Sequence, residues 1–127
     1  MHSIRKDIHK NRLYLSISGV ISISEANKIK DEVIAETSEL KPGFDVINNL
    51  SKYIKGDERA APMLQAVEKF FIENKVNRIV RVVGTSKTGL MQFAKYSQPK
   101  ENVNILYFPT MHEAETFLNK DLKRLHK

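Results

Sequence analysis

The run Ile79–Val83 constrains the fold more than any other part of the sequence, because it is apolar and β-branched except at Arg81. This pattern is typical of a strand in a parallel sheet that helices cover on both faces. A buried arginine would need a carboxylate, for which Asp45 or Asp57 could serve. A position at the sheet edge or on a partly exposed face is the simpler interpretation of Arg81.

A β-hairpin is predicted at the start of the chain. Its strands are Ser3–Ile8 and Arg12–Ser18, with Lys10 and Asn11 between them. The second strand alternates apolar and polar residues, which is typical of a half-buried strand. Gly19 is expected to end it.

An amphipathic helix is predicted next. Ser22 with Glu25 three residues later fits a capping box, and Ser24 is the competing N-cap. The segment Lys41-Pro42-Gly43 should end the helix, because proline cannot donate the next helical hydrogen bond and glycine supplies the turn. The predicted apolar face consists of Ala26, Ile29, Val33, Thr37 and Leu40.

The middle of the chain predicts a strand, a polar loop and a second helix. The strand is Phe44–Leu50, and Pro62 suits the first turn of the helix, where its missing N–H has no cost. The apolar face of this helix comprises Met63, Leu64, Val67, Phe70 and Phe71. We expect Val46, Ile47, Val80 and Val82 to lie in the core.

The last part of the chain predicts a third helix over about 87–96, a strand over Asn104–Phe108 and a final helix after Pro109. Thr110 with Glu113 forms a second capping box. The whole chain, residues 1–127, is therefore expected to form one α/β domain in the order β-β-α-β-α-β-α-β-α. It should contain a mainly parallel five-stranded sheet with an antiparallel edge strand, about four helices and a basic helical tail near 120–127.

Composition narrows the class of protein. With 127 residues, 41% hydrophobic and 28% charged, the chain is long enough for one core without metals or disulfides, and it has no cysteine. No apolar run approaches a membrane span, so we expect a cytoplasmic protein. The net charge of +6 is scattered except in the tail, which argues against a nucleic-acid partner.

The order of elements resembles the STAS family, the sulfate transporter and anti-sigma factor antagonist domains, in particular its soluble bacterial branch. The resemblance covers nearly the whole chain and includes a glycine followed by a capped helix, here Gly19–Ala26. The family's strand-loop signature is D-L-S, five residues, then D-S-S-G. It corresponds here to Asn49-Leu50-Ser51, then Lys52 to Gly56, then Asp57-Glu58-Arg59-Ala60.

The resemblance implies a non-catalytic regulatory module that binds a protein partner, an anti-sigma factor or a kinase-like protein, without a cofactor. The two serines of the family's loop fall on Glu58 and Arg59, so the family's phosphorylated residue is missing. Glu58 could mimic a phosphate, although Arg59 beside it offsets its charge. Equally, Asp57 and Glu58 could simply stabilise the start of the next helix. The predicted partner-binding residues are Ser51, Lys52, Asp57, Glu58 and Arg59.

Other motifs carry less information. Gly84–Gly89 has the outer glycine spacing of a phosphate loop but lacks its Lys-Ser/Thr pair. An anion site formed by Thr85, Ser86, Lys87 and Thr88 stays an alternative to plain helix capping. The histidines lack metal-ligand spacing, so no metal is expected. The alternative functions are a small-molecule or anion-binding domain, or a small enzyme that uses Asp57, Glu58 and Arg59. Association into a homodimer is a further possibility.

Overall fold

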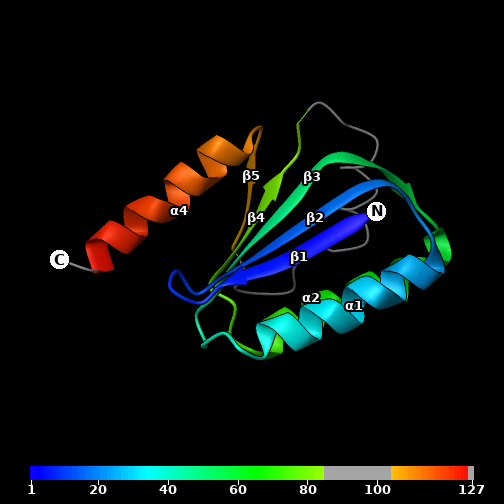
Figure 1. Ribbon diagram of the computed structural model, residues 1–127, viewed down its shortest axis with the longest axis horizontal. Helices are drawn as coiled ribbons and strands as arrows, with labels where there is room; N and C mark the ends of the chain where they lie inside the picture. Colours follow the sequence, from blue (N-terminus) through cyan, green and yellow to red (C-terminus); the bar gives the residue numbers. More distant parts are fainter. Residues whose placement is uncertain (85–103, 126–127) are drawn as a thin grey trace.

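A five-stranded sheet in the order β1-β2-β3-β4-β5 forms the centre of the structure (Figure 1). The structure is a computed structural model that describes residues 1–84 and 104–125. The strands are β1 (His2–Asp7), β2 (Arg12–Ile21), β3 (Asp45–Gly56), β4 (Arg78–Val82) and β5 (Asn104–Phe108). β1 is antiparallel to β2 and every other pair is parallel, which confirms the predicted sheet.

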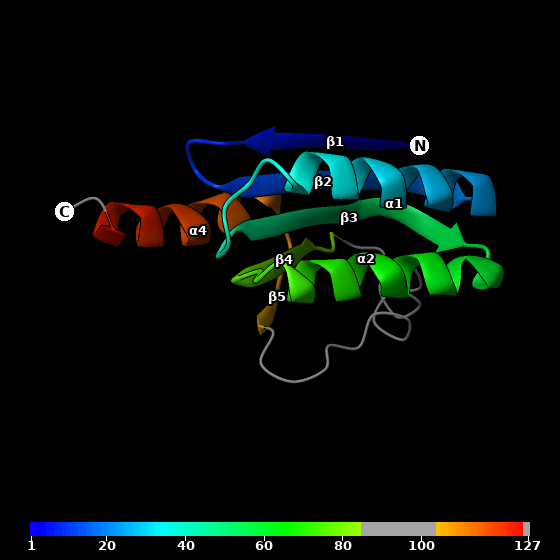
Figure 2. The same ribbon diagram turned by 90° about the horizontal axis from the view of Figure 1, so that it is seen from below.

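Helices cover both faces of the sheet (Figures 1 and 2). The helices are α1 (Ile23–Thr37), α2 (Ala61–Glu73) and α4 (Met111–Leu125), with a 3₁₀ turn η1 (Glu58–Ala60) before α2. We call the side covered by α1 and α2 the α1/α2 face, and the side on which α4 packs against β4 and β5 the α4 face. The helix expected over about 87–96 and the segment Thr85–Thr88 lie outside the described residues.

The larger core lies on the α1/α2 face. Alternate residues of β2 pack there against the predicted apolar stripe of α1, of which Ile29 and Val33 are almost fully buried. Phe44 and Phe71 meet edge to face, with their ring centroids 6.0 Å apart, and so fix α2 to the sheet. The burial confirms the helical periodicity of both segments. The predicted end of the first helix is wrong, because α1 ends at Thr37, so that Leu40 and the segment Lys41-Pro42-Gly43 lie beyond it.

A smaller core lies on the α4 face, where Ala114 and Leu118 of α4 cover Val80 and Val82 of β4. Val46, Ile47, Val80 and Val82 are each at most 1% exposed, as predicted. Because successive strand residues point to opposite faces, both cores draw on the same strands.

Local signals set the helix starts. Ser22 Oγ accepts a hydrogen bond from the Glu25 backbone N–H at 3.1 Å, so Ser22 is the N-cap and Ser24 is not. The Glu25 carboxylate does not complete the capping box but lies 2.8 Å from Nδ1 of His2, which attaches β1 to α1. Thr110 Oγ1 accepts from the Glu113 N–H at 3.2 Å, as predicted for the last helix.

Two predicted strand ends are wrong. β2 continues through Gly19 to Ile21, and β3 continues past Leu50 to Gly56. Gly19 has φ +74 and lies at a shift in the β2–β3 register, so it permits an irregularity instead of ending the strand. The polar residues after Leu50 remain in strand conformation because β2 pairs with them.

The simpler interpretation of Arg81 is also wrong, because its side chain is buried and only 2% exposed. Its Nη1 donates a hydrogen bond to the Tyr107 hydroxyl at 3.0 Å. Asp45 instead pairs with Arg78, its register neighbour on β4, through two hydrogen bonds of 3.1 and 2.9 Å. Strand register decides which arginine meets the carboxylate, and register is not visible in local sequence.

Candidate functional site

The predicted site lies where β2 and β3 extend beyond β4. The β3–β4 register ends at Asn49 and Val82, whereas β2 and β3 stay paired as far as Ile21 and Gly56. Figure 1 shows this extension curving toward the start of α1. We call residues 18–22 and 51–59 the β2–β3 tip.

The tip is anchored by a buried tyrosine. Tyr53 is 3% exposed and packs in the larger core. A Cβ atom on Gly56 would lie 2.8 Å from the Tyr53 hydroxyl oxygen, so only glycine fits against this ring without a shift. The tip therefore presents its surface groups from a well-packed base.

The structure separates the predicted partner-binding residues into two groups. Ser51 and Lys52 lie within β3, while Asp57, Glu58 and Arg59 form its exit into η1. The six residue steps of extended chain from Ser51 to Asp57 span roughly 20 Å. Ser51 does not point to the acidic group, because its N–H and hydroxyl both donate to Asn49 Oδ1, at 3.1 and 2.7 Å.

Asp57 and Arg59 form a local unit. Asp57 Oδ1 accepts from the Arg59 backbone N–H at 2.9 Å, and the guanidinium donates to both carboxylate oxygens at 3.1 and 2.8 Å. The side-chain hydrogen bond from Arg59 lowers the pKa of Asp57, and the same bond raises the pKa of Arg59. Arg59 therefore neutralises Asp57 and not Glu58, whose exposed carboxylate has no hydrogen bond or ion pair among the described residues.

A broad hollow of about 530 Å³ lies beside the tip, and Asp57 and Glu58 line it together with Val20 and Lys55. The underlying void between the tip and α1 measures only about 10 Å³, about enough for one water molecule. Arg59 does not line the hollow, and the Asp57 carboxylate is already bound. An acid–base site requires its groups to converge on one enclosed point. The three residues proposed for catalysis do not do so.

Sequence reasoning missed the most exposed apolar residues of the tip. Val20 is 58% exposed and Ile54 is 57% exposed, although both lie in strands. Lys52 and Lys55 are exposed beside them and form no ion pair within the part of the chain that the structure describes. Strand alternation around the buried Tyr53 could have identified Ile54, but only after β3 had been extended past Leu50.

The other predicted sites are not formed by described residues. Thr85, Ser86, Lys87 and Thr88 lie outside them. Within residues 1–84 and 104–125, no group of three or more His, Asp or Glu side chains has the arrangement of a metal site. No helix in those ranges is both long enough and apolar enough to cross a membrane.

Comparison with known proteins gives the fold. No family model and no curated protein matches the sequence. An uncharacterized DUF3478-family protein with a SpoIIAA-like fold, from Shewanella loihica, matches with a TM-score of 0.63 and 9% identity over 93% of this chain and 92% of that chain. The Bacillus cell fate determinant SpoIIAA, in its phosphorylated form, matches with a TM-score of 0.53 and 8% identity over 93% and 99%. The chain therefore has the SpoIIAA-like fold of STAS domains.

Proposed function

We propose that this protein is a regulatory module that binds a protein partner through the β2–β3 tip. The observation that carries the proposal is the exposure of two aliphatic side chains, Val20 of β2 and Ile54 of β3, on the two-stranded extension. The SpoIIAA-like fold supports a regulatory role of the anti-sigma factor antagonist type, with an anti-sigma factor or a kinase-like protein as partner.

The charges of the tip indicate the chemistry of this partner. Lys52 and Lys55 flank the aliphatic pair, and the Asp57 carboxylate is neutralised by Arg59. An apolar patch with an acidic rim would complement this surface, because interfaces combine a buried apolar centre with a charged periphery. Glu58 opposes such a partner, so Glu58→Lys should speed association while Lys52→Glu slows it.

The first prediction concerns Ile54. Ile54→Asp should weaken partner binding by about tenfold or more, because it places a charge at the centre of the contact. Ile8→Asp is the matched control, since Ile8 is also exposed, at 64%, but follows β1 at the hairpin turn. Partners recovered from host lysate with the wild type would be titrated against both variants.

The proposal fails if Ile54→Asp and the wild type bind the recovered partner equally well while both remain folded. Equal losses with Ile54→Asp and Ile8→Asp would show that the tip has no special role. A loss restricted to Ile8→Asp would place the interface at the hairpin turn instead.

A further inference from the structure

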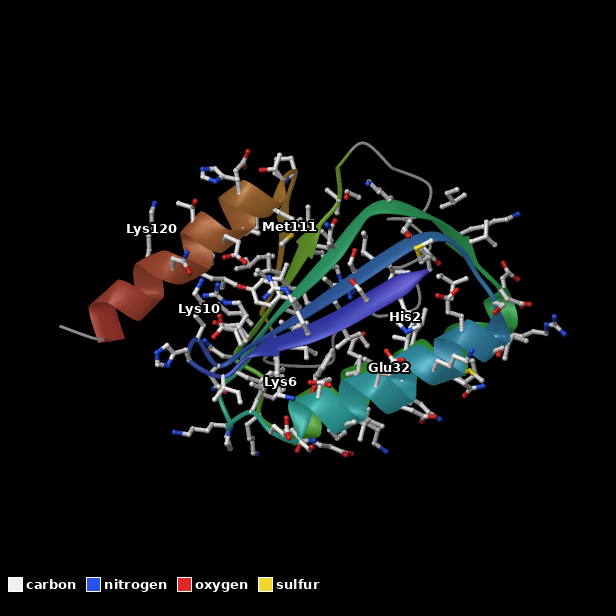
Figure 3. The ribbon with its side chains drawn as sticks, viewed as in Figure 1. His2, Lys6, Lys10, Glu32, Met111 and Lys120 are labelled. Carbon is white, nitrogen blue, oxygen red and sulfur yellow. The ribbon has the colours of Figure 1, made fainter. Side chains whose placement is uncertain are left out.

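The α4 face of the sheet contains a second hollow, separate from the one beside the tip. α4 packs on β4 and β5, and a hollow of about 160 Å³ lies over β1, β2 and β3 next to the first residue of this helix. Figure 3 shows that residue, Met111, at the end of α4 that meets the sheet.

Strand register assembles the floor of this hollow as two rows of side chains. Ser3, Ser16 and Asn49 are successive partners across β1, β2 and β3, and they form a polar row. Arg5, Tyr14 and Ile47 form the parallel row beside it. Neighbours in such rows lie close enough to act together on one ligand.

The polar groups of the hollow are mostly hydrogen-bond donors. Asn49 Oδ1 is occupied by both Ser51 donors, so the amide Nδ2 of Asn49 is the group left for a ligand. The Arg5 guanidinium lies 3.7 Å from the centroid of the Tyr14 ring and has no carboxylate partner among the described residues. No carboxylate lines the hollow, and Ser3 and Ser16 add two hydroxyls.

Tyr14 contributes an apolar wall. Its hydroxyl is held by Arg12, whose Nη1 lies 3.2 Å away, and burial raises the pKa of the phenol, which therefore stays neutral near pH 7. Cation–π contact with this ring holds the Arg5 guanidinium at the hollow. Ile47 is only 1% exposed, so the half-buried Met111 supplies most of the remaining apolar surface that a ligand can reach.

We propose that this hollow binds a small carboxylic acid with a short aliphatic chain. The carboxylate would pair with Arg5, whose planar fork matches its two oxygens, and would accept from the Asn49 amide. The aliphatic part would lie against Met111.

Volume restricts the ligand. The hollow measures about 160 Å³, which suits a small acid of roughly five to eight heavy atoms. Nucleotides and cofactors need larger pockets, of roughly 300 Å³ or more. A cation of the same size is repelled by Arg5, and inorganic phosphate makes no use of the apolar wall.

Titration with butyrate, followed by amide chemical shifts, tests the proposal. Butyrate should give saturable shifts at Ser3, Ser16, Asn49 and Met111, and butylamine should give none. Arg5→Gln should weaken butyrate binding by about tenfold or more, because the charge-assisted pair is lost. Arg59→Gln is the matched control and should bind butyrate like the wild type, since Arg59 lies in η1 and does not line this hollow.

Ser16→Leu provides a second variant, because its larger side chain would fill the hollow from the middle of the polar row. It should abolish binding while thermal melting shows that the protein is folded. The proposal is overturned if butyrate gives no saturable shifts, if Arg5→Gln binds as well as the wild type, or if phosphate binds as tightly as butyrate. Partner binding at the β2–β3 tip is independent of all three outcomes.

Discussion

Asp57 and Glu58 are adjacent, but only the Asp57 carboxylate is hydrogen-bonded to the backbone and side chain of Arg59. Asp57 caps η1 and is neutralised by Arg59, so its charge is not presented to a partner. Glu58 retains its charge because Arg59 is directed to Asp57 and not to it. The sequence-based expectation that Arg59 offsets Glu58 is therefore wrong, and Glu58 is the residue of this loop that could act on a partner by charge.

The second prediction concerns phosphorylation of this loop. Residues 56–60 contain no hydroxyl, so incubation with host lysate and labelled ATP should leave them unmodified. Ser51 should also resist modification, because its hydroxyl is half-buried and donates to Asn49 at 2.7 Å. Mass-spectrometric mapping checks both points. A stable phosphoryl group on residues 56–60 or on Ser51 would contradict the prediction, and label on Ser51, Thr85, Ser86 or Thr88 would show that the switch has moved to that residue.

At the scale of elements, the extension of β3 beyond β4 creates the tip. Two features support it, namely pairing with β2 as far as Gly56 and the insertion of Tyr53 into the core. The junction between β3 and η1 is consequently tight, since the Tyr53 hydroxyl occupies the space that a side chain at residue 56 would need.

The third prediction tests this junction with a double-mutant cycle. Gly56→Ala should destabilise the protein by about 1–3 kcal/mol, because the added methyl must displace the Tyr53 ring. The same change in a Tyr53→Phe background should cost markedly less, because the colliding oxygen is absent. Urea unfolding of the four proteins gives the coupling free energy. A coupling near zero would mean that the Tyr53 hydroxyl does not determine the need for glycine.

For the whole molecule, stability depends on a sheet with a separate core on each face. The core on the α4 face is the smaller one, and Val82 at the end of β4 is 1% exposed within it. A charge there would have no route to water and no partner, which is among the most destabilising changes that a single residue can make.

The fourth prediction follows from that burial. Val82→Asp should lower the free energy of unfolding by about 4 kcal/mol or more and unfold much of the protein at room temperature. Val20→Asp is the matched control, because Val20 is 58% exposed and its replacement should change stability by about 0.5 kcal/mol or less. Thermal melting compares the two. Similar midpoints for both variants would refute the central position of β4.

Periodicity and capping residues determined the type and order of the described elements from the sequence alone. Thr110 was identified as a cap, Ser22 was one of two candidates, and the apolar stripes of α1 and α2 were identified as core faces, because these signals act between residues within one or two turns. Alternation of strands and helices similarly predicted the parallel sheet.

Only the tertiary structure decided which distant residues meet. The sequence could not show that Asp45 pairs with Arg78 instead of Arg81, or that β2 holds the polar residues after Leu50 in a strand. It also could not show that Arg5, Ser16 and Asn49 share one hollow. The physical reason is that each depends on the register between strands, and local propensity carries no information about register.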